Sequence, residues 1–220
     1  MTEPSGGGAG DYHGVHLRPD PARAVVWRVV ADYLAPWMPP DGEILEIGAG
    51  YCDWINAVKG RRRVAVDVWP LLSGHAAAGV EAVVTDLAAH GLSAVGGGPF
   101  DVALASNVLE HFEPDRAAAL VGEVAARLRQ GGRFVVIQPN FRDAHRRYFD
   151  DYTHRSVFTH VSLAALLRSR GFDIERSEPR FLPFSMQDRR WPIASWLVRA
   201  YLRSPVRPWA GQMLIIARKR

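Results

Sequence analysis

Five short apolar runs, each bounded by glycine, proline or aspartate, recur along the first two-thirds of the sequence. They span residues 44–47, 63–68, 81–85, 100–105 and 133–138. Runs of this length are typical of strands, and their near-continuous apolar character indicates burial on both faces. A helical pattern opened by Asp20 and ended by Pro36 precedes the first run, and another, opened by Pro114 and capped by Gly131, separates the last two. This alternation predicts a doubly wound α/β fold built on a mostly parallel sheet.

The sequence after Asn140 follows a different pattern. A polar, aromatic loop at residues 145–154 precedes a helix that we expect at 161–170. Residues 172–177 and 212–217 are further strand candidates. The C-terminal part of the chain is therefore predicted to add one helix and two strands to the domain.

An insert at residues 179–211 separates the last two strand candidates. It contains five prolines and three of the seven tryptophans in the chain. Ile193, Trp196, Leu197 and Tyr201 fall at helical spacing, which predicts an amphipathic helix. We expect the insert to be a lid or specificity element packed on the sheet. The alternatives are a contact with a membrane surface, for which the helix is short, and an oligomer contact.

The length and composition fit one domain. We assign it residues 12–220, after a flexible glycine-rich leader at residues 1–11. A hydrophobic share of 48% with 23% charged residues excludes a disordered chain. No apolar run is long enough to span a bilayer, and the leader lacks the pattern of a secretory signal. Cys52 is the only cysteine, so neither an intramolecular disulfide nor a cysteine-based zinc site can form. A cytoplasmic protein is expected.

The first strand candidate runs directly into the bend Gly48-Ala49-Gly50, where a ligand can approach the backbone closely. A dinucleotide site needs a third glycine, where a helix packs beneath the pyrophosphate. Asp53 occupies that position, and a carboxylate there repels the diphosphate that the helix end attracts. Glu46 adds a second acidic group just before the bend. The bend is therefore suited to a positively charged ligand.

Two aspartates close the next two strand candidates. Asp67 is placed to accept hydrogen bonds from a ribose diol, as the acidic residue at this position does in nucleotide-binding α/β domains. Asp86 can accept from an exocyclic amine such as that of adenine. Helix capping is the alternative role of either residue taken alone. Together with the bend, these strand ends suit a ligand with an ammonium group, a ribose and an adenine, which is S-adenosylmethionine.

Several motifs, in order, carry a resemblance to a known family. They are LEIGAGYCDW, VAVDV, VVTDL, FDVALASNVLEHF and LRQGGRFVVIQPN. Over residues 12–175 the chain resembles the class I S-adenosylmethionine-dependent methyltransferases. The resemblance implies a seven-stranded Rossmann-like fold with S-adenosylmethionine as cofactor. The later segment YFDDYTHRSVFTHVSLAALLRSRGF is similar to a subgroup associated with bacterial sugar, glycan and natural-product methylation.

The resemblance also implies which residues contact the cofactor. Those for the methionine moiety are Glu46, Gly48, Ala49 and Gly50. Asp67 is implied to bind the ribose, and Asp86 with Leu87 to contact the adenine. Val68 is a further cofactor-binding residue. Asn107 faces the methionine or the methyl acceptor. Tyr51 and Cys52 depart from the family pattern, which has smaller residues there, and this departure affects the expected shape of the bend.

Methyl transfer needs the acceptor and the methyl group held in line, and an alcohol acceptor benefits from a general base. His111 follows the fourth strand candidate and His154 lies in the aromatic loop, so both fall near the ligand crevice of a parallel sheet. Either histidine is a candidate base, with packing or positioning as the alternative role. Because His145, Asp150, His154 and His160 follow no familiar ligand spacing, no metal site is expected.

The expected function is methyl transfer to a small-molecule or sugar-containing acceptor, preferentially at a hydroxyl, with N-methylation as the alternative. Nucleic-acid methylation is a further alternative, because the C-terminal third is basic. Arg142, Arg146, Arg147, Tyr148 and Phe149 offer charge and stacking there. No binding domain is appended, however, and Asn140 lacks the neighbours of an amino-methylating site, so a nucleic-acid partner is not favoured.

Two other classes remain open at this point. An NAD(P)-dependent oxidoreductase needs a pyrophosphate site, and Asp53 counts against one. A non-catalytic cofactor-binding scaffold is the other alternative. The sequence leaves the oligomeric state open.

Overall fold

The computed structural model describes residues 20–184 and 193–220, so the predicted leader at residues 1–11 lies outside the described part. Seven strands form one sheet in the order β3-β2-β1-β4-β5-β7-β6. Their bounds are β1 Glu43–Ile47, β2 Arg62–Asp67, β3 Val80–Val84, β4 Phe100–Ser106, β5 Leu128–Pro139, β6 Phe172–Pro183 and β7 Ala210–Lys219. The predicted doubly wound, mostly parallel, seven-stranded fold is confirmed.

The strand order reverses at β1. This strand pairs in parallel with β2 on one side and with β4 on the other. β7 runs antiparallel to both of its neighbours, β5 and β6. In sheets of this kind ligands bind beyond the carboxyl ends of the strands next to the reversal. The segments after β1 and β4 are therefore the expected walls of the ligand site.

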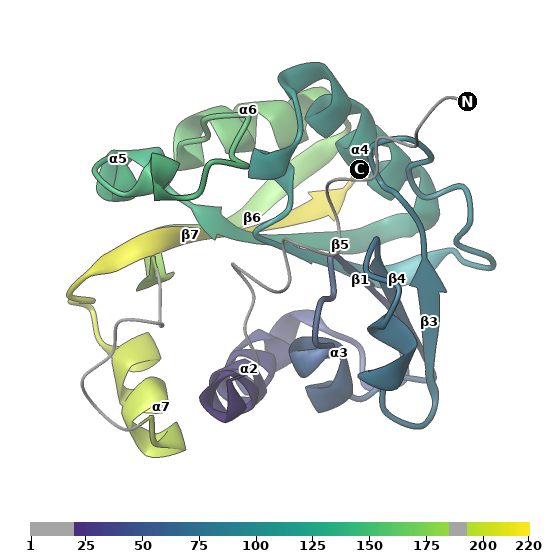
Figure 1. Cartoon of the computed structure of the whole chain (residues 1–220), viewed down its shortest axis with the longest axis horizontal. Helices are drawn as coiled ribbons and strands as arrows, with labels where there is room; N and C mark the ends of the chain where they lie inside the picture. The colour runs from purple at the N-terminus through teal and green to yellow at the C-terminus, as the bar shows by residue number, and fades with distance from the viewer. Residues whose placement is uncertain (1–19, 185–192) are drawn as a thin grey trace, which may run out of the picture.

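Helices cover both faces of the sheet (Figure 1). One face carries α2 Pro21–Leu34, α3 Asp53–Ala57 and α7 Ser195–Arg203, and the other carries α4 Pro114–Arg127, α5 Phe141–Ala144 and α6 His160–Ser169. Leu34 belongs to the core on the first face and Leu167 to the core on the second. Neighbouring side chains of a strand point to opposite faces, so Ile44 joins the first core and Leu45 the second.

The end of α4 differs from the prediction. The helix stops before the predicted cap Gly131, because Leu128 already pairs with Phe100 as the first residue of β5. Gly131, with φ 74°, lies instead where the register between β4 and β5 shifts. Gly131 therefore lies at an irregular part of the β4–β5 pairing and does not cap a helix.

The insert before β7 also starts differently from the prediction. β6 continues to Pro183 against β7, so the segment predicted at residues 179–211 begins as strand. Its amphipathic helix is present as α7, which buries Leu202 in the core that α2 covers. Arg199 of α7 pairs with Asp32 of α2 at 2.7 Å. Among the described residues, no helix has the length and apolar character needed to cross a membrane.

Candidate active site

The bend after β1 depends on two glycines with positive φ. Gly48 has φ 70° and Gly50 has φ 50°, in the left-handed region that is costly for other residues. A Cβ at Gly48 would lie 2.4 Å from Cγ2 of Val108, just after β4. The N–H of Gly48 donates to the carbonyl of Val66 in β2 at 2.8 Å. The bend and the segment after β4 are therefore in contact, with no space for a side chain between them.

Asp67, the last residue of β2, fixes the bend by hydrogen bonds to its backbone. It is buried, with 6% of its surface exposed. Its Oδ2 accepts from the N–H of Gly50 at 2.8 Å, and its Oδ1 accepts from the N–H of Trp69 at 2.9 Å. A carboxylate accepts several hydrogen bonds at once, so this structural role is compatible with the predicted ribose contact.

The acidic groups near the bend are partly neutralised within the chain. Glu46 accepts from the N–H of Ile55 at 3.1 Å, and burial raises its pKa well above the usual value, with repulsion from Asp53 and Asp67 adding to the shift. Asp53 pairs with Arg23 at 3.3 Å. This pair weakens the sequence argument that Asp53 repels a diphosphate. The preference for a cation therefore rests on Glu46, whose charged form a bound cation favours, and on Asp67.

Next to the bend lies an aromatic cluster that the sequence patterns did not predict. The ring centroids of Tyr51 and Trp69 are 5.0 Å apart, and the rings of Trp69 and His75 stack at 4.8 Å. Arg23 lies 5.7 Å from the centroid of Tyr51. Cys52 has φ 57°, and burial raises the pKa of its thiol to about 12, so the thiol is unreactive. Tyr51 is thus accommodated by packing beside the bend. The only sequence feature that pointed to this cluster was the departure of Tyr51 from the small residues of the family pattern.

The predicted adenine-binding residues lie in the loop after β3. Asp86 is exposed, and its Oδ1 accepts from the N–H of Ala88 at 2.7 Å, which closes a turn and not the helix start considered as the alternative. Leu87 is buried, and its carbonyl accepts from Nε and Nη2 of Arg116 at 2.9 and 2.6 Å. Val68 is exposed next to Asp67. An arginine from α4 therefore fixes this loop, which sequence spacing did not reveal.

Asn107, directly after β4, makes hydrogen bonds to β5 and β7. It has φ 52°, and its N–H donates to the carbonyl of Ile137 at 2.8 Å. Its Oδ1 accepts from Nε2 of Gln212 in β7 at 3.2 Å, and Gln212 also reaches the carbonyl of Phe184 at 3.4 Å. Gln138 of β5 is buried, and within the described part of the chain neither polar atom of its side chain has a hydrogen-bond partner. The segment after β4 thus contacts β7, and Gln212 links it to the residue that follows β6.

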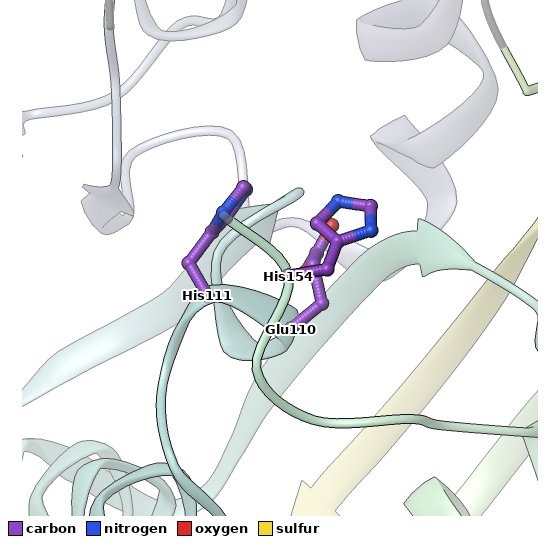
Figure 2. A group of neighbouring side chains, drawn as sticks. All are labelled: Glu110, His111 and His154. Atoms are coloured by element: carbon purple, nitrogen blue, oxygen red, sulfur yellow. The ribbon is translucent and has the colours of Figure 1, made fainter. Parts of the chain in front are cut away.

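The two predicted histidines meet, together with a carboxylate that was not predicted (Figure 2). Glu110 and His111 lie on the short helix η3 Leu109–His111, and His154 lies on the loop after η4 Tyr148–Asp150. The two imidazole centroids are 5.0 Å apart, and one candidate ligand atom from each of the three residues lies within 4.8 Å of the others. As far as the chain is described, this group does not include the other residues considered for a metal, His145, Asp150 and His160.

Hydrogen bonds determine the tautomers of both histidines. Burial raises the pKa of Asp151, but hydrogen bonds from Thr153 and the nearby His111 and His154 lower it below the usual value, so it is charged. Thr153 Oγ1 donates its single proton to Asp151 Oδ1 at 2.5 Å, and therefore accepts from Nδ1 of His111 at 2.9 Å. Nδ1 of His154 donates to the carbonyl of Tyr148 at 2.6 Å. Each neutral ring thus carries its lone pair on Nε2.

The surface considered for stacking nucleic-acid bases differs from the prediction. Tyr148 is fully buried, and its hydroxyl donates to the carbonyl of Ser156 at 2.6 Å, so no base can stack on it. Phe149 is exposed. Arg147 lies 5.7 Å from the ring centroid of Phe184. The inclusion of Tyr148 in a stacking surface was therefore wrong.

Comparisons with known proteins agree with this fold. The family model described as "Methyltransferase domain" matches residues 22–177. A SAM-dependent methyltransferase from Archaeoglobus fulgidus has a TM-score of 0.66 at 18% identity, with 90% of this chain and 94% of that chain covered. N-methyltransferase NodS from Bradyrhizobium japonicum, solved with S-adenosyl-l-homocysteine, has a TM-score of 0.60 at 15% identity, with 93% and 91% covered.

A third solved structure is 1,6-didemethyltoxoflavin-N1-methyltransferase from Burkholderia thailandensis, with a TM-score of 0.60 at 22% identity and 96% of this chain and 84% of that chain covered. No curated protein has significant sequence similarity to the chain. The family match includes the glycine bend, Asp67 at the end of β2, Asp86 in the loop after β3, and both histidines. The chain is therefore an enzyme of the class I S-adenosylmethionine-dependent methyltransferase family.

Proposed function

We propose that this enzyme transfers a methyl group from S-adenosylmethionine to a hydroxyl of a small-molecule or sugar-containing acceptor in the cytoplasm. The observation that supports a hydroxyl acceptor is the pair of imidazoles, His111 and His154, with their tautomers set by the protein. A hydroxyl is a weak nucleophile until it loses its proton, whereas an amine need only arrive neutral. Two histidines positioned to remove a proton therefore favour methylation of a hydroxyl oxygen over methylation of an amine nitrogen.

The residues at the strand ends fit the cofactor. The Val108 side chain occupies the place that a side chain at Gly48 would take, and the glycines of the bend carry no side chain that would keep a ligand from the backbone. A buried carboxylate, Asp67, lies directly beneath it. The residues proposed to hold the methionine moiety, the ribose and the adenine are those that the sequence predicts: Glu46, Gly48, Ala49, Gly50, Asp67, Val68, Asp86 and Leu87. When bound, the cofactor supplies a methyl group on a positively charged sulfur.

The acceptor is proposed to lie beside Asn107, His111 and His154. The contact between the bend and Val108 places the start of this segment against the cofactor-binding loop. Nε2 of either histidine can accept the hydroxyl proton, because Nδ1 is already protonated. Asp151 stabilises the imidazolium that forms, through Thr153 for His111 and from 4.0 Å for His154.

We assign acceptor specificity to the insert at residues 179–211. Phe184, just after β6, lies next to Gln212, whose side chain also donates to Asn107. The insert thus borders the acceptor side of the site at both of its ends. α7 packs on α2 and serves as the buttress that holds the insert in place.

Cofactor binding and the site of methylation can be measured separately. Isothermal titration calorimetry is expected to give a Kd for S-adenosylmethionine in the micromolar range, about −8 kcal/mol, and no binding of NAD⁺ or NADP⁺. With a trideuteromethyl-labelled cofactor, mass spectrometry of a panel of glycosides, phenols and amines is expected to show label on oxygen. Binding of a nicotinamide dinucleotide alone contradicts the cofactor assignment. Label found only on nitrogen overturns the hydroxyl assignment and leaves the methyltransferase activity in place.

A further inference from the structure

Glu110 is a buried carboxyl group with no explanation in the fold itself. None of its surface is exposed, and neither carboxyl oxygen has a hydrogen-bond partner among the described residues. Leaving such a group buried and unpaired is costly, and native structures rarely do so without a bound ion or water. The carboxyl group is therefore placed to bind an ion or a water molecule.

The neighbours of Glu110 are the donors that a transition metal prefers. His111 and His154 each use Nδ1–H for a hydrogen bond to an oxygen, which leaves the lone pair on Nε2. Histidines that bind metals commonly donate their other ring nitrogen to a carbonyl or to a group linked to a carboxylate, and this bond orients the ring. The carbonyl oxygen of Tyr148 serves His154 in this way, and Thr153 with Asp151 serves His111. The outer contacts of a metal site are thus already formed.

The backbone holds the two segments that carry these side chains. The carbonyl of Glu110 accepts from the N–H groups of Arg155 and Ser156 at 2.8 and 3.0 Å. Ser156 Oγ donates to the carbonyl of Phe112 at 2.6 Å. Because these bonds flank the candidate ligands on both sides, the loop after η4 cannot move away from η3 without breaking them.

We propose that Glu110, His111 and His154 bind a divalent first-row transition-metal ion such as Zn²⁺, Co²⁺ or Mn²⁺. Two imidazoles with one carboxylate suit these ions, whereas Mg²⁺ and Ca²⁺ prefer all-oxygen sites. The candidate ligand atoms lie within 4.8 Å of one another. Ions of this class bind nitrogen and oxygen at about 2.1 Å, so the side chains draw inward on binding. Three protein ligands leave at least one position for water or an acceptor oxygen.

Both histidines proposed to face the acceptor belong to this group of neighbouring side chains (Figure 2). The binding claim itself does not depend on the acceptor, but its consequence for catalysis rests on the proposed function. A metal ion lowers the pKa of an oxygen acid that it coordinates. With the ion bound, a hydroxyl that coordinates it would lose its proton to water, and the histidines would hold the metal instead of accepting that proton.

Metal binding can be measured without any acceptor. Calorimetric titration of the metal-free full-length protein with Zn²⁺ is expected to show one site, and saturation should raise Tm by about 5 °C or more. Titration with Co²⁺ should give the visible absorption of a bound ion. The variants Glu110→Gln, His111→Gln and His154→Gln are each expected to weaken Zn²⁺ binding at least about 10-fold. The matched control His160→Gln, outside the group, should bind Zn²⁺ as the unchanged protein does.

Absence of Zn²⁺ and Co²⁺ binding overturns the proposal, as does binding that all three variants retain. Circular dichroism and S-adenosylhomocysteine affinity show whether each variant is folded. If Glu110→Gln does not fold, His154→Gln and the Co²⁺ spectrum decide the question. Metal binding without methyl transfer to oxygen leaves the metal site standing and rejects the proposed acceptor. Oxygen methylation by protein that binds no metal supports the proposed acceptor and rejects the metal site.

Discussion

Replacing Asp67 by alanine is expected to weaken binding of S-adenosylhomocysteine by about 100-fold or more, the largest loss from any single side chain at the cofactor site. The carboxylate holds the N–H groups of Gly50 and Trp69 and is proposed to bind the ribose. Hydrogen bonds to a charged group contribute about 1.5–3 kcal/mol each. Losing the ribose contacts and the shape of the bend together therefore exceeds the ~2.7 kcal/mol that corresponds to 100-fold. Calorimetry on the purified variant measures the change.

Two further variants separate the causes. Asp67→Asn keeps one acceptor oxygen but turns an NH₂ group towards a backbone N–H, so we expect an intermediate loss of about 10-fold. Asp173→Ala removes an aspartate whose side chain is 71% exposed and which pairs with Arg220, and it should leave the affinity unchanged. Cofactor affinity within twofold of the unchanged protein in Asp67→Ala is incompatible with a ribose contact.

Gly48→Ala is expected to lower both stability and cofactor affinity. The new methyl group would lie 2.4 Å from Cγ2 of Val108, at a φ of 70°. The left-handed backbone costs about 1–2 kcal/mol and the overlap about 1–3 kcal/mol, so Tm should fall by roughly 5–15 °C. Because the bend must move away from the segment after β4, cofactor affinity should fall at least about 10-fold. Thermal unfolding and calorimetry give the two values.

A matched glycine and a double variant control this result. A methyl group added at Gly122 of α4 would meet no atom of the described residues within 4 Å, so Gly122→Ala should keep or raise stability by about 0.5–1 kcal/mol. Adding Val108→Ala to Gly48→Ala removes the overlap but not the backbone cost. The double variant should therefore lose less stability than the sum of the two single variants. Strict additivity contradicts the contact between the bend and the segment after β4.

The parallel half of the sheet could be predicted because its signals are local. Each strand contains a short apolar run, the first three runs lead into a glycine or an aspartate, and burial on both faces makes such runs distinct. The positions of Gly48 and Asp67 follow directly from this pattern, since the topology brings the carboxyl ends of β1 and β2 to one edge. The acidic loop after β3 was placed by the same argument.

The remaining features depend on contacts between distant residues. Arg23 neutralises Asp53, and Arg116 holds the carbonyl of Leu87, yet neither pairing has a fixed spacing in the sequence. Glu110 lies in a motif common to the fold, and hydrogen bonds between distant segments, among them those from the N–H groups of residues 155 and 156 to its carbonyl, bring His154 to it. Gly131 has the pattern of a helix cap, but pairing of Leu128 with Phe100 ends the helix earlier. Tertiary contacts decided each of these outcomes.

The central claim is that the acidic ends of adjacent strands, beside the glycine bend, select a positively charged adenosyl donor. A crystal structure with S-adenosylhomocysteine tests it most directly. The account predicts ribose hydroxyls within hydrogen-bond distance of Asp67, the amino-acid portion against the bend, and the sulfur facing the segment of Asn107 and His111. A complex in which Asp67 contacts no ribose hydroxyl, or in which the bend holds a phosphate group, contradicts it.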